Sequence, residues 1–86
     1  MKKINFEQLK QLGYEEGKEL LLKSGYFIDD AAIERKEDYN IIDQYFTLYD
    51  EENTLLHTVS HVSYEKPVLN AAPELINEEN WHWEEI

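Results

Sequence analysis

Residues 41–64 read IIDQYFTLY, DEEN and TLLHTVSHVSY, and this stretch decides the fold. The outer runs, residues 41–49 and 54–64, are rich in β-branched and aromatic side chains, which are typical of strands. The four residues between them favour a type I turn, in which Asn53 tolerates a positive φ. The sequence therefore predicts a β-hairpin.

The register of this hairpin predicts which side chains share a face. Pairing Tyr49 with Thr54 sends alternate side chains to opposite faces. One face then carries Ile42, Phe46, Leu48, Leu55, His57 and Val59, and the other carries Ile41, Tyr45, Tyr49, Leu56, Val62 and Tyr64. Neither face is wholly polar. We expect one to pack on N-terminal helices, and the other to be covered by the C-terminal segment or offered to a partner.

The residues before the hairpin have a helical pattern. Apolar residues recur at helical spacing between Asn5, a suitable N-cap, and Gly13. A second helical stretch covers residues 14–24, and Gly25 is suited to a left-handed C-cap. Two helices are the preferred interpretation. The spacing of Gly13 and Gly17 also fits one unbroken helix packed closely against a neighbour.

The residues after the hairpin predict a helix and an extended tail. Pro67 ends the second strand because it has no amide hydrogen to donate. Residues 71–79 predict a short helix with a proline in its first turn. In the tail NWHWEEI, Trp81 and Trp83 alternate, so they share one face if the tail is extended.

Together these patterns predict an α+β fold class. N-terminal helices pack on a small antiparallel β-hairpin or sheet, followed by a short C-terminal helix and an acidic aromatic tail. Residues 29–40 fit either a short helical turn or a loop. A length of 86 residues suits one small acidic domain, residues 1–86. Cysteine is absent, so the fold must rest on packing without disulfides.

The charge of the chain is strongly acidic. There are 19 acidic and 8 basic residues, for a net charge of −11. No basic residue lies between Glu37 and Glu65, and none follows Lys66. Such a surface repels nucleic acid and anionic lipid and attracts basic proteins. The sequence therefore predicts a basic protein partner, with no direct binding of nucleic acid or membrane.

The sequence has no pattern for membrane insertion or secretion. No apolar run approaches the roughly 18 to 20 residues needed to span a bilayer. Lys2 and Lys3 are not followed by the apolar stretch of a signal peptide. We therefore expect a cytoplasmic location in a bacterial cell. The many Lys, Asn, Ile and Tyr residues suggest an AT-rich source, such as a low-GC bacterium or its phage.

Candidate catalytic and metal-binding patterns are weak. Among the three histidines, His57 and His61 are four residues apart, which in a strand is about 13 Å. That separation is too long for two bonds of about 2 Å to one zinc ion. There is no glycine-rich phosphate loop, nucleophile elbow, zinc-protease motif or cysteine nucleophile. The sequence therefore predicts no metal, no cofactor and no enzymatic activity.

Acidic and aromatic residues are the candidate contacts for a basic partner. Rows of carboxylates can imitate phosphates and steer association, while aromatic side chains supply affinity. The predicted partner-binding residues are Glu37, Asp38, Tyr45, Tyr49, Asp50, Glu51, Glu52, Glu78, Glu79, Trp81, Trp83, Glu84 and Glu85. Because so small a domain needs its large apolar groups, we expect at least one tryptophan to lie in the core.

In size and composition the chain is similar to phage-encoded inhibitors of host nucleases, including DNA-mimicking restriction inhibitors, uracil-glycosylase inhibitors and several anti-CRISPR proteins. The resemblance rests on no aligned motif and assigns no residue. It implies a host-defence antagonist that inhibits a basic, nucleic-acid-binding protein by occupying its phosphate-binding surface. Two alternatives stay open: an immunity or antitoxin protein for a nuclease toxin, and a phage or bacterial assembly protein that forms a homo-oligomer. The charge can also serve solubility alone.

Overall fold

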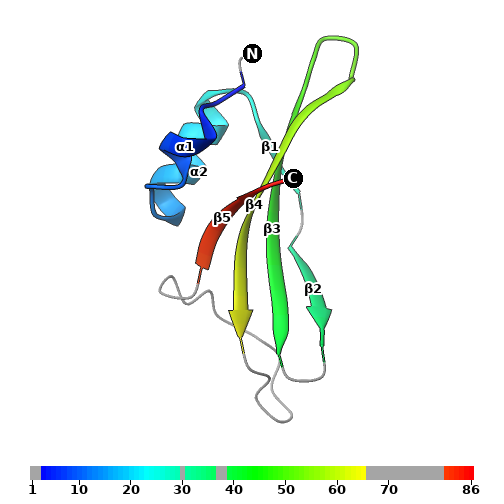
Figure 1. Cartoon of the computed structure of the whole chain (residues 1–86). Helices are drawn as coiled ribbons and strands as arrows, with labels where there is room; N and C mark the ends of the chain where they lie inside the picture. The colour runs from blue at the N-terminus through cyan, green and yellow to red at the C-terminus, as the bar shows by residue number, and fades with distance from the viewer. Residues whose placement is uncertain (1–2, 30, 37–38, 66–80) are drawn as a thin grey trace.

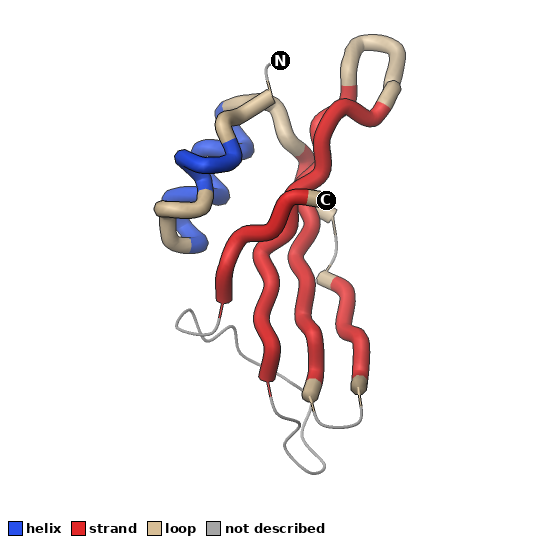
Figure 2. The backbone as a smooth tube through the Cα atoms, in the orientation of Figure 1, coloured by secondary structure: helices blue, strands red, loops and turns tan. Residues whose placement is uncertain are grey.

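The chain folds into two short helices and one antiparallel sheet (Figures 1 and 2). The computed structural model describes residues 3–29, 31–36, 39–65 and 81–86. The elements are α1 (Phe6–Leu9), α2 (Tyr14–Lys23), β1 (Phe27–Ile28), β2 (Ala32–Arg35), β3 (Asn40–Tyr49), β4 (Leu55–Glu65) and β5 (Trp81–Glu85). The strand order is β1-β3-β4-β5, and β2 also pairs with β3.

The predicted fold class is wrong. The described chain is mainly a five-stranded antiparallel sheet with only two short helices, rather than helices packed on a small hairpin. Residues 32–35 pair with β3 as a strand instead of forming a helical turn or loop. This pairing satisfies the backbone donors and acceptors on that side of β3, and it outweighs the local polar composition. The helix predicted over residues 71–79 lies outside the described residues.

The β3–β4 hairpin is confirmed, with a difference at its tip. Asp50 closes the turn because its carboxylate accepts hydrogen bonds from two backbone amides, each at 2.8 Å. Asn53 adopts a φ of 62°, the left-handed conformation expected of it. The predicted pairing of Tyr49 with Thr54 is wrong, because a bulge shifts the register and places Leu55 opposite Tyr49. Both long strands otherwise follow the predicted alternation.

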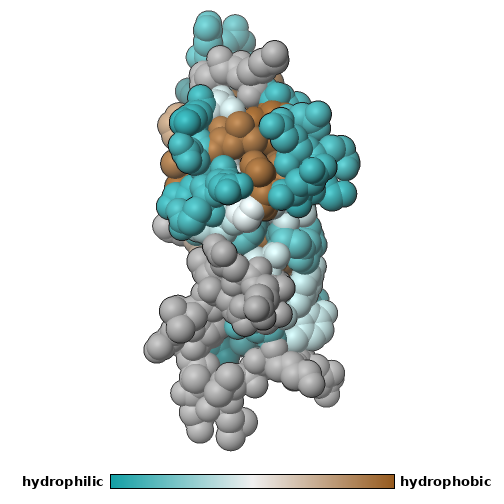
Figure 3. Space-filling view, turned by 90° about the vertical axis from the view of Figure 1, so that its left-hand side faces the viewer, coloured by the Kyte–Doolittle hydropathy of each residue, from teal (hydrophilic) through white to brown (hydrophobic). Residues whose placement is uncertain are grey.

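The core lies between the helices and one face of the sheet, which we call the covered face. The helices lie on one side of the sheet in Figure 1, and Figure 3 shows a hydrophobic area bordered by hydrophilic residues on that side. The buried residues of the core are Leu9, Leu21, Tyr26, Phe46, Leu48, Val59 and Trp83. The members on β3, β4 and β5 share one face of the sheet because they alternate along paired strands.

The two tryptophans lie on β5, which pairs with β4. Trp81 is opposite Ser63 and Trp83 is opposite His61. Both indole rings are buried on the covered face. The prediction that the two tryptophans share a face is confirmed, and so is the prediction that at least one of them belongs to the core.

Trp83 packs directly against α2. Its Nε1 donates a hydrogen bond to the carbonyl oxygen of Leu12 at 3.0 Å, and its ring centroid is 5.5 Å from that of Phe46. A Cβ atom at Gly17 would lie 2.8 Å from Cε2 and 3.0 Å from Nε1 of this indole. The missing side chain at Gly17 therefore allows α2 to approach β5 closely.

We expect Gly17→Ala to lower the free energy of unfolding by about 1 to 3 kcal/mol, because overpacking outweighs the roughly 1 kcal/mol that alanine gains in a helix. Gly13→Ala is the matched control, since a Cβ atom there meets nothing within 4 Å. Urea unfolding of both variants measures the difference. Equal midpoints for the two variants would contradict the proposed contact with Trp83.

Candidate functional site

The face of the sheet opposite the helices gathers carboxylates and tyrosines from several strands. Glu34 on β2, Asp43 on β3 and Glu84 on β5 project to this face, because alternate residues of paired strands share a face. We call this surface the acidic face, and its members are Glu34, Asp43, Tyr45, Tyr64, His82 and Glu84. No described helix covers it (Figure 1).

Hydrogen bonds and ring stacking hold the side chains of the acidic face in place. The ring of Tyr64 stacks on that of His82, with centroids 5.6 Å apart, and its hydroxyl donates to Oε1 of Glu84 at 3.1 Å. Nε2 of His82 lies 2.7 Å from the same oxygen. The hydroxyl of Tyr45 donates to Asp43 at 3.2 Å. Two carboxylates are thus oriented by tyrosines.

The carboxylates of the acidic face act on one another. Partial burial raises the pKa of Asp43, the hydrogen bond from Tyr45 lowers it, and the charges of Glu84 and Glu34 raise it further. Burial and the Asp43 charge raise the pKa of Tyr45. The hydrogen bond to Glu84, followed by burial, raises the pKa of Tyr64. A partner that brings positive charge to this face relieves repulsion that already exists.

Positive charge is sparse around this face. β3, β4 and β5 contain neither lysine nor arginine. Glu34 pairs with Lys36 at 3.2 Å. Within the described residues, Asp43 and Glu84 form no ion pair with lysine or arginine. Both carboxylates are therefore available to a basic partner.

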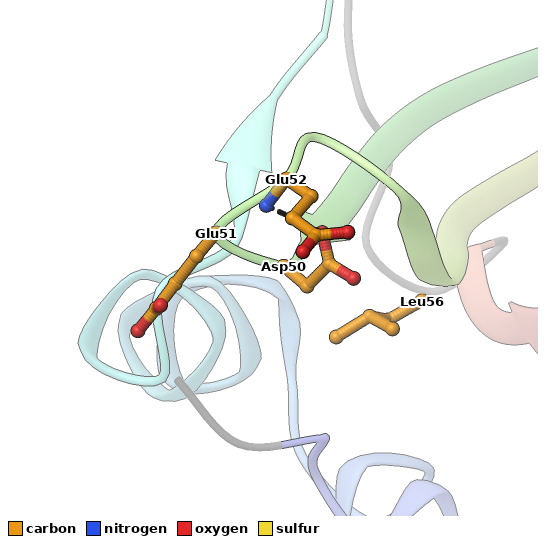
Figure 4. A pocket seen from close by; sticks show the side chains of 4 residues that line it. All are labelled: Asp50, Glu51, Glu52 and Leu56. Atoms are coloured by element: carbon orange, nitrogen blue, oxygen red, sulfur yellow. Dashed lines mark hydrogen bonds between the residues drawn. The ribbon is translucent and has the colours of Figure 1, made fainter.

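The hairpin tip forms a second acidic area. Asp50, Glu51 and Glu52 line a hollow of about 420 Å³ together with Leu56. Figure 4 shows Glu51 extending away from the space toward which Asp50 and Leu56 point. The tip acids continue the negative charge beyond the acidic face.

The structure separates the predicted partner-binding residues into groups. Tyr45 and Glu84 belong to the acidic face; Tyr49, Asp50, Glu51 and Glu52 lie at the hairpin tip; Trp81, Trp83 and Glu85 lie on the covered face. Glu37, Asp38, Glu78 and Glu79 lie outside the described residues. The acidic face also includes four residues that were not predicted from the sequence, Glu34, Asp43, Tyr64 and His82. Alternation along the hairpin already places Asp43 and Tyr64 on the same face as Tyr45. Glu34 joins this face only because β2 pairs with β3, and His82 only because β5 pairs with β4.

Glu85 belongs to a hydrogen-bonded chain on the covered face. Nε2 of the buried His57 lies 2.7 Å from its carboxylate, and Nδ1 lies 2.5 Å from the hydroxyl of Tyr26. The Tyr26 hydroxyl also accepts from the amide of Ile4 at 3.3 Å. Burial raises the pKa of Tyr26. These bonds tie β5 to the N-terminal part of the chain.

His57 and His61 both lie on β4, as predicted from the sequence, and both are buried. No group of three or more potential metal ligands comes together among the described residues. In the same part of the chain, no helix has the length and hydrophobicity needed to cross a membrane.

The chain was compared with known proteins. No family model matches it, no curated protein matches it, and no solved structure matches it.

Proposed function

We propose that the chain is a non-enzymatic protein that inhibits a basic, nucleic-acid-binding partner by occupying the partner's phosphate-binding surface. The observation that supports this proposal is the acidic face. It combines carboxylates from three strands with tyrosines, and β3, β4 and β5 carry neither lysine nor arginine. Surfaces that hold phosphates present lysine and arginine, which pair equally well with carboxylates.

The geometry of the acidic face suits such a partner. Glu34 is a diagonal neighbour of Asp43 on the adjacent strand, at about 7 to 8 Å, and Glu84 lies two strands across and two residues along from Asp43, at about 12 Å. One basic surface can therefore meet all three carboxylates. Hydrogen bonds from Tyr45 and Tyr64 orient two of them before binding, which reduces the entropy lost in the complex.

A partner of opposite charge is favoured over a second copy of the chain. Packing two acidic faces together would bring Asp43 and Glu84 of each copy near carboxylates of the other, with little positive charge to compensate. Like charges in an interface cost several kcal/mol. The acidic face therefore supports an inhibitor, including an immunity protein that binds one nuclease, more than a homo-oligomer.

A charge-neutralised variant tests this proposal. We expect the triple variant Glu34→Gln, Asp43→Asn and Glu84→Gln to associate at least about tenfold more slowly with the basic protein captured from a bacterial lysate. Association of the parent should slow as salt rises from about 50 to 500 mM, and the variant should show a weaker dependence. Surface plasmon resonance measures both rates.

The matched control removes the same charge from α2, through Glu15→Gln, Glu16→Gln and Glu19→Gln. We expect it to keep most of the association rate. The captured protein should also release duplex DNA when the parent chain binds. Equal slowing by the two triple variants, or simultaneous binding of DNA and the chain, would contradict the proposal.

A further inference from the structure

Large apolar side chains are exposed at the hairpin-tip end of the sheet. Phe27 is 59% exposed, Leu55 55%, Leu56 48% and Ile86 67%. Tyr49 lies beside them and is partly exposed. We call these five residues the apolar patch. Exposed apolar surface that is continuous, rather than scattered singly, marks interaction sites in soluble proteins.

The patch crosses three strands through Phe27 on β1, Tyr49 on β3 and Leu55 on β4, because Tyr49 contacts Phe27 and is opposite Leu55. Phe27 is opposite Thr47, which is opposite Thr58, and the amide of Ile86 donates to the carbonyl oxygen of Thr58 at 3.0 Å. These four residues form one row on the same side of the sheet as the acidic face, in which Thr47 and Thr58 separate Phe27 from Ile86. The ring of Tyr49 extends the row toward the tip, with its centroid 6.3 Å from that of Phe27.

The two leucines at the bulge extend the patch to a hollow in the surface. Leu55, Leu56 and Ile86 line this hollow, which has a volume of about 440 Å³ and also includes Lys3 and Glu85. Leu56 lines the neighbouring hollow of the tip acids as well. Apolar side chains and carboxylates therefore meet in both hollows, and Figure 4 shows the hollow of the tip acids.

Carboxylates border the patch on two sides. The tip acids, residues 50–52, follow Tyr49 directly along the chain. Glu84 of the acidic face precedes Ile86 by two strand positions, about 7 Å. An apolar centre with a charged rim is the usual anatomy of a protein interface, in which the centre supplies affinity and the rim steers association.

We infer that the apolar patch is the anchor of the interface, and that it docks an apolar cluster of the partner flanked by lysine or arginine on both sides. The inference rests on the proposed function. It adds an apolar part of the partner's surface, next to the part that binds phosphate. Because carboxylates lie on both sides of the patch, an occupant of complementary charge carries lysine or arginine on both sides of its apolar cluster. A second copy of the chain is disfavoured because each copy carries a net charge of −11.

Two labelled peptides of equal charge test the anchor. One is oligolysine, and the other is an amphipathic helix with leucines along one face and lysines beside them. By fluorescence anisotropy at about 150 mM salt, we expect the chain to bind the amphipathic peptide at least about tenfold more tightly than oligolysine. The double variant Phe27→Ser and Ile86→Ser should reduce this ratio to near one.

Ile33→Ser is the matched control, because Ile33 is 50% exposed on β2 and lies outside the patch. It should keep the ratio of affinities, and circular dichroism should show that all variants remain folded. Equal, salt-dependent binding of both peptides by the parent would overturn the anchor and leave the acidic face supported.

Two further outcomes would also overturn the anchor. If neither peptide binds at about 50 mM salt, the proposed function fails together with it. If sedimentation shows a dimer that the double variant abolishes, a second copy of the chain occupies the patch.

Discussion

Trp83→Ala is expected to lower the free energy of unfolding by about 3 to 5 kcal/mol. The indole is buried against Phe46 and Gly17, and its Nε1 bonds to the carbonyl oxygen of Leu12. Truncation would leave a cavity between α2 and the sheet and an unpaired carbonyl oxygen. A chain of this size has a total stability of about 4 to 13 kcal/mol, so the loss is a large share of it and would unfold the chain at the lower end of this range.

Urea unfolding followed by circular dichroism measures this loss. Phe27→Ala is the matched control, because it also truncates an aromatic side chain but one that is mostly exposed. We expect the control to change the free energy of unfolding by about 0.5 kcal/mol or less. A Trp83→Ala chain as stable as the control would contradict the place of Trp83 in the core.

Acidification from pH 7 to pH 4 is expected to remove up to about 3 kcal/mol of stability through His61 alone. Burial, followed by the charge of His82, lowers the pKa of His61 from 6.5 to about 4. The imidazole stacks on Trp81 with ring centroids 4.8 Å apart and contacts Tyr14. Among the described residues, its Nδ1 has no hydrogen-bond partner. The folded chain therefore favours neutral His61.

Acid lowers the free energy of unfolding because the unfolded chain takes up a proton that the folded chain does not. Between pH 6.5 and about 4, the unfolded chain binds a proton at His61 and the folded chain does not. Acid therefore favours the unfolded chain, so the contribution of His61 is complete above pH 6.5 and is lost as the pH falls toward 4. Carboxylates titrate in the lower part of this range, so the comparison must be made between variants.

His61→Phe keeps an aromatic ring but cannot take up a proton. Relative to the parent, we expect its urea midpoint to fall less between pH 7 and pH 4.5. His82→Gln is the control, because it removes an exposed imidazole on the opposite face whose charge is only the smaller cause of the lowered pKa of His61. It should keep most of the parental pH dependence. An unchanged dependence in His61→Phe would show that another group causes the acid sensitivity.

The parts of the fold that depend on neighbouring residues were predictable from the sequence. Alternation in residues 41–64 predicts the hairpin, and alternation of Trp81 and Trp83 predicts their shared face. The partners of the hairpin were not predictable, because strands pair through backbone groups that every sequence offers. β2 is short, with only Ala32 and Ile33 as apolar residues in a polar stretch, and β5 joins β4 from a distant part of the chain. The acidic face depends on both of these pairings.

The hydrogen bond between Leu12 and Trp83 joins residues 71 positions apart in the sequence. The core that the helices cover lacks its central indole until residue 83 has been added, and helices this short need packing to be stable. Contacts of such long range make folding slow, because the chain must lose much of its freedom before they form. The order of synthesis therefore leaves Gly17 and the apolar side of α2 exposed until β5 docks.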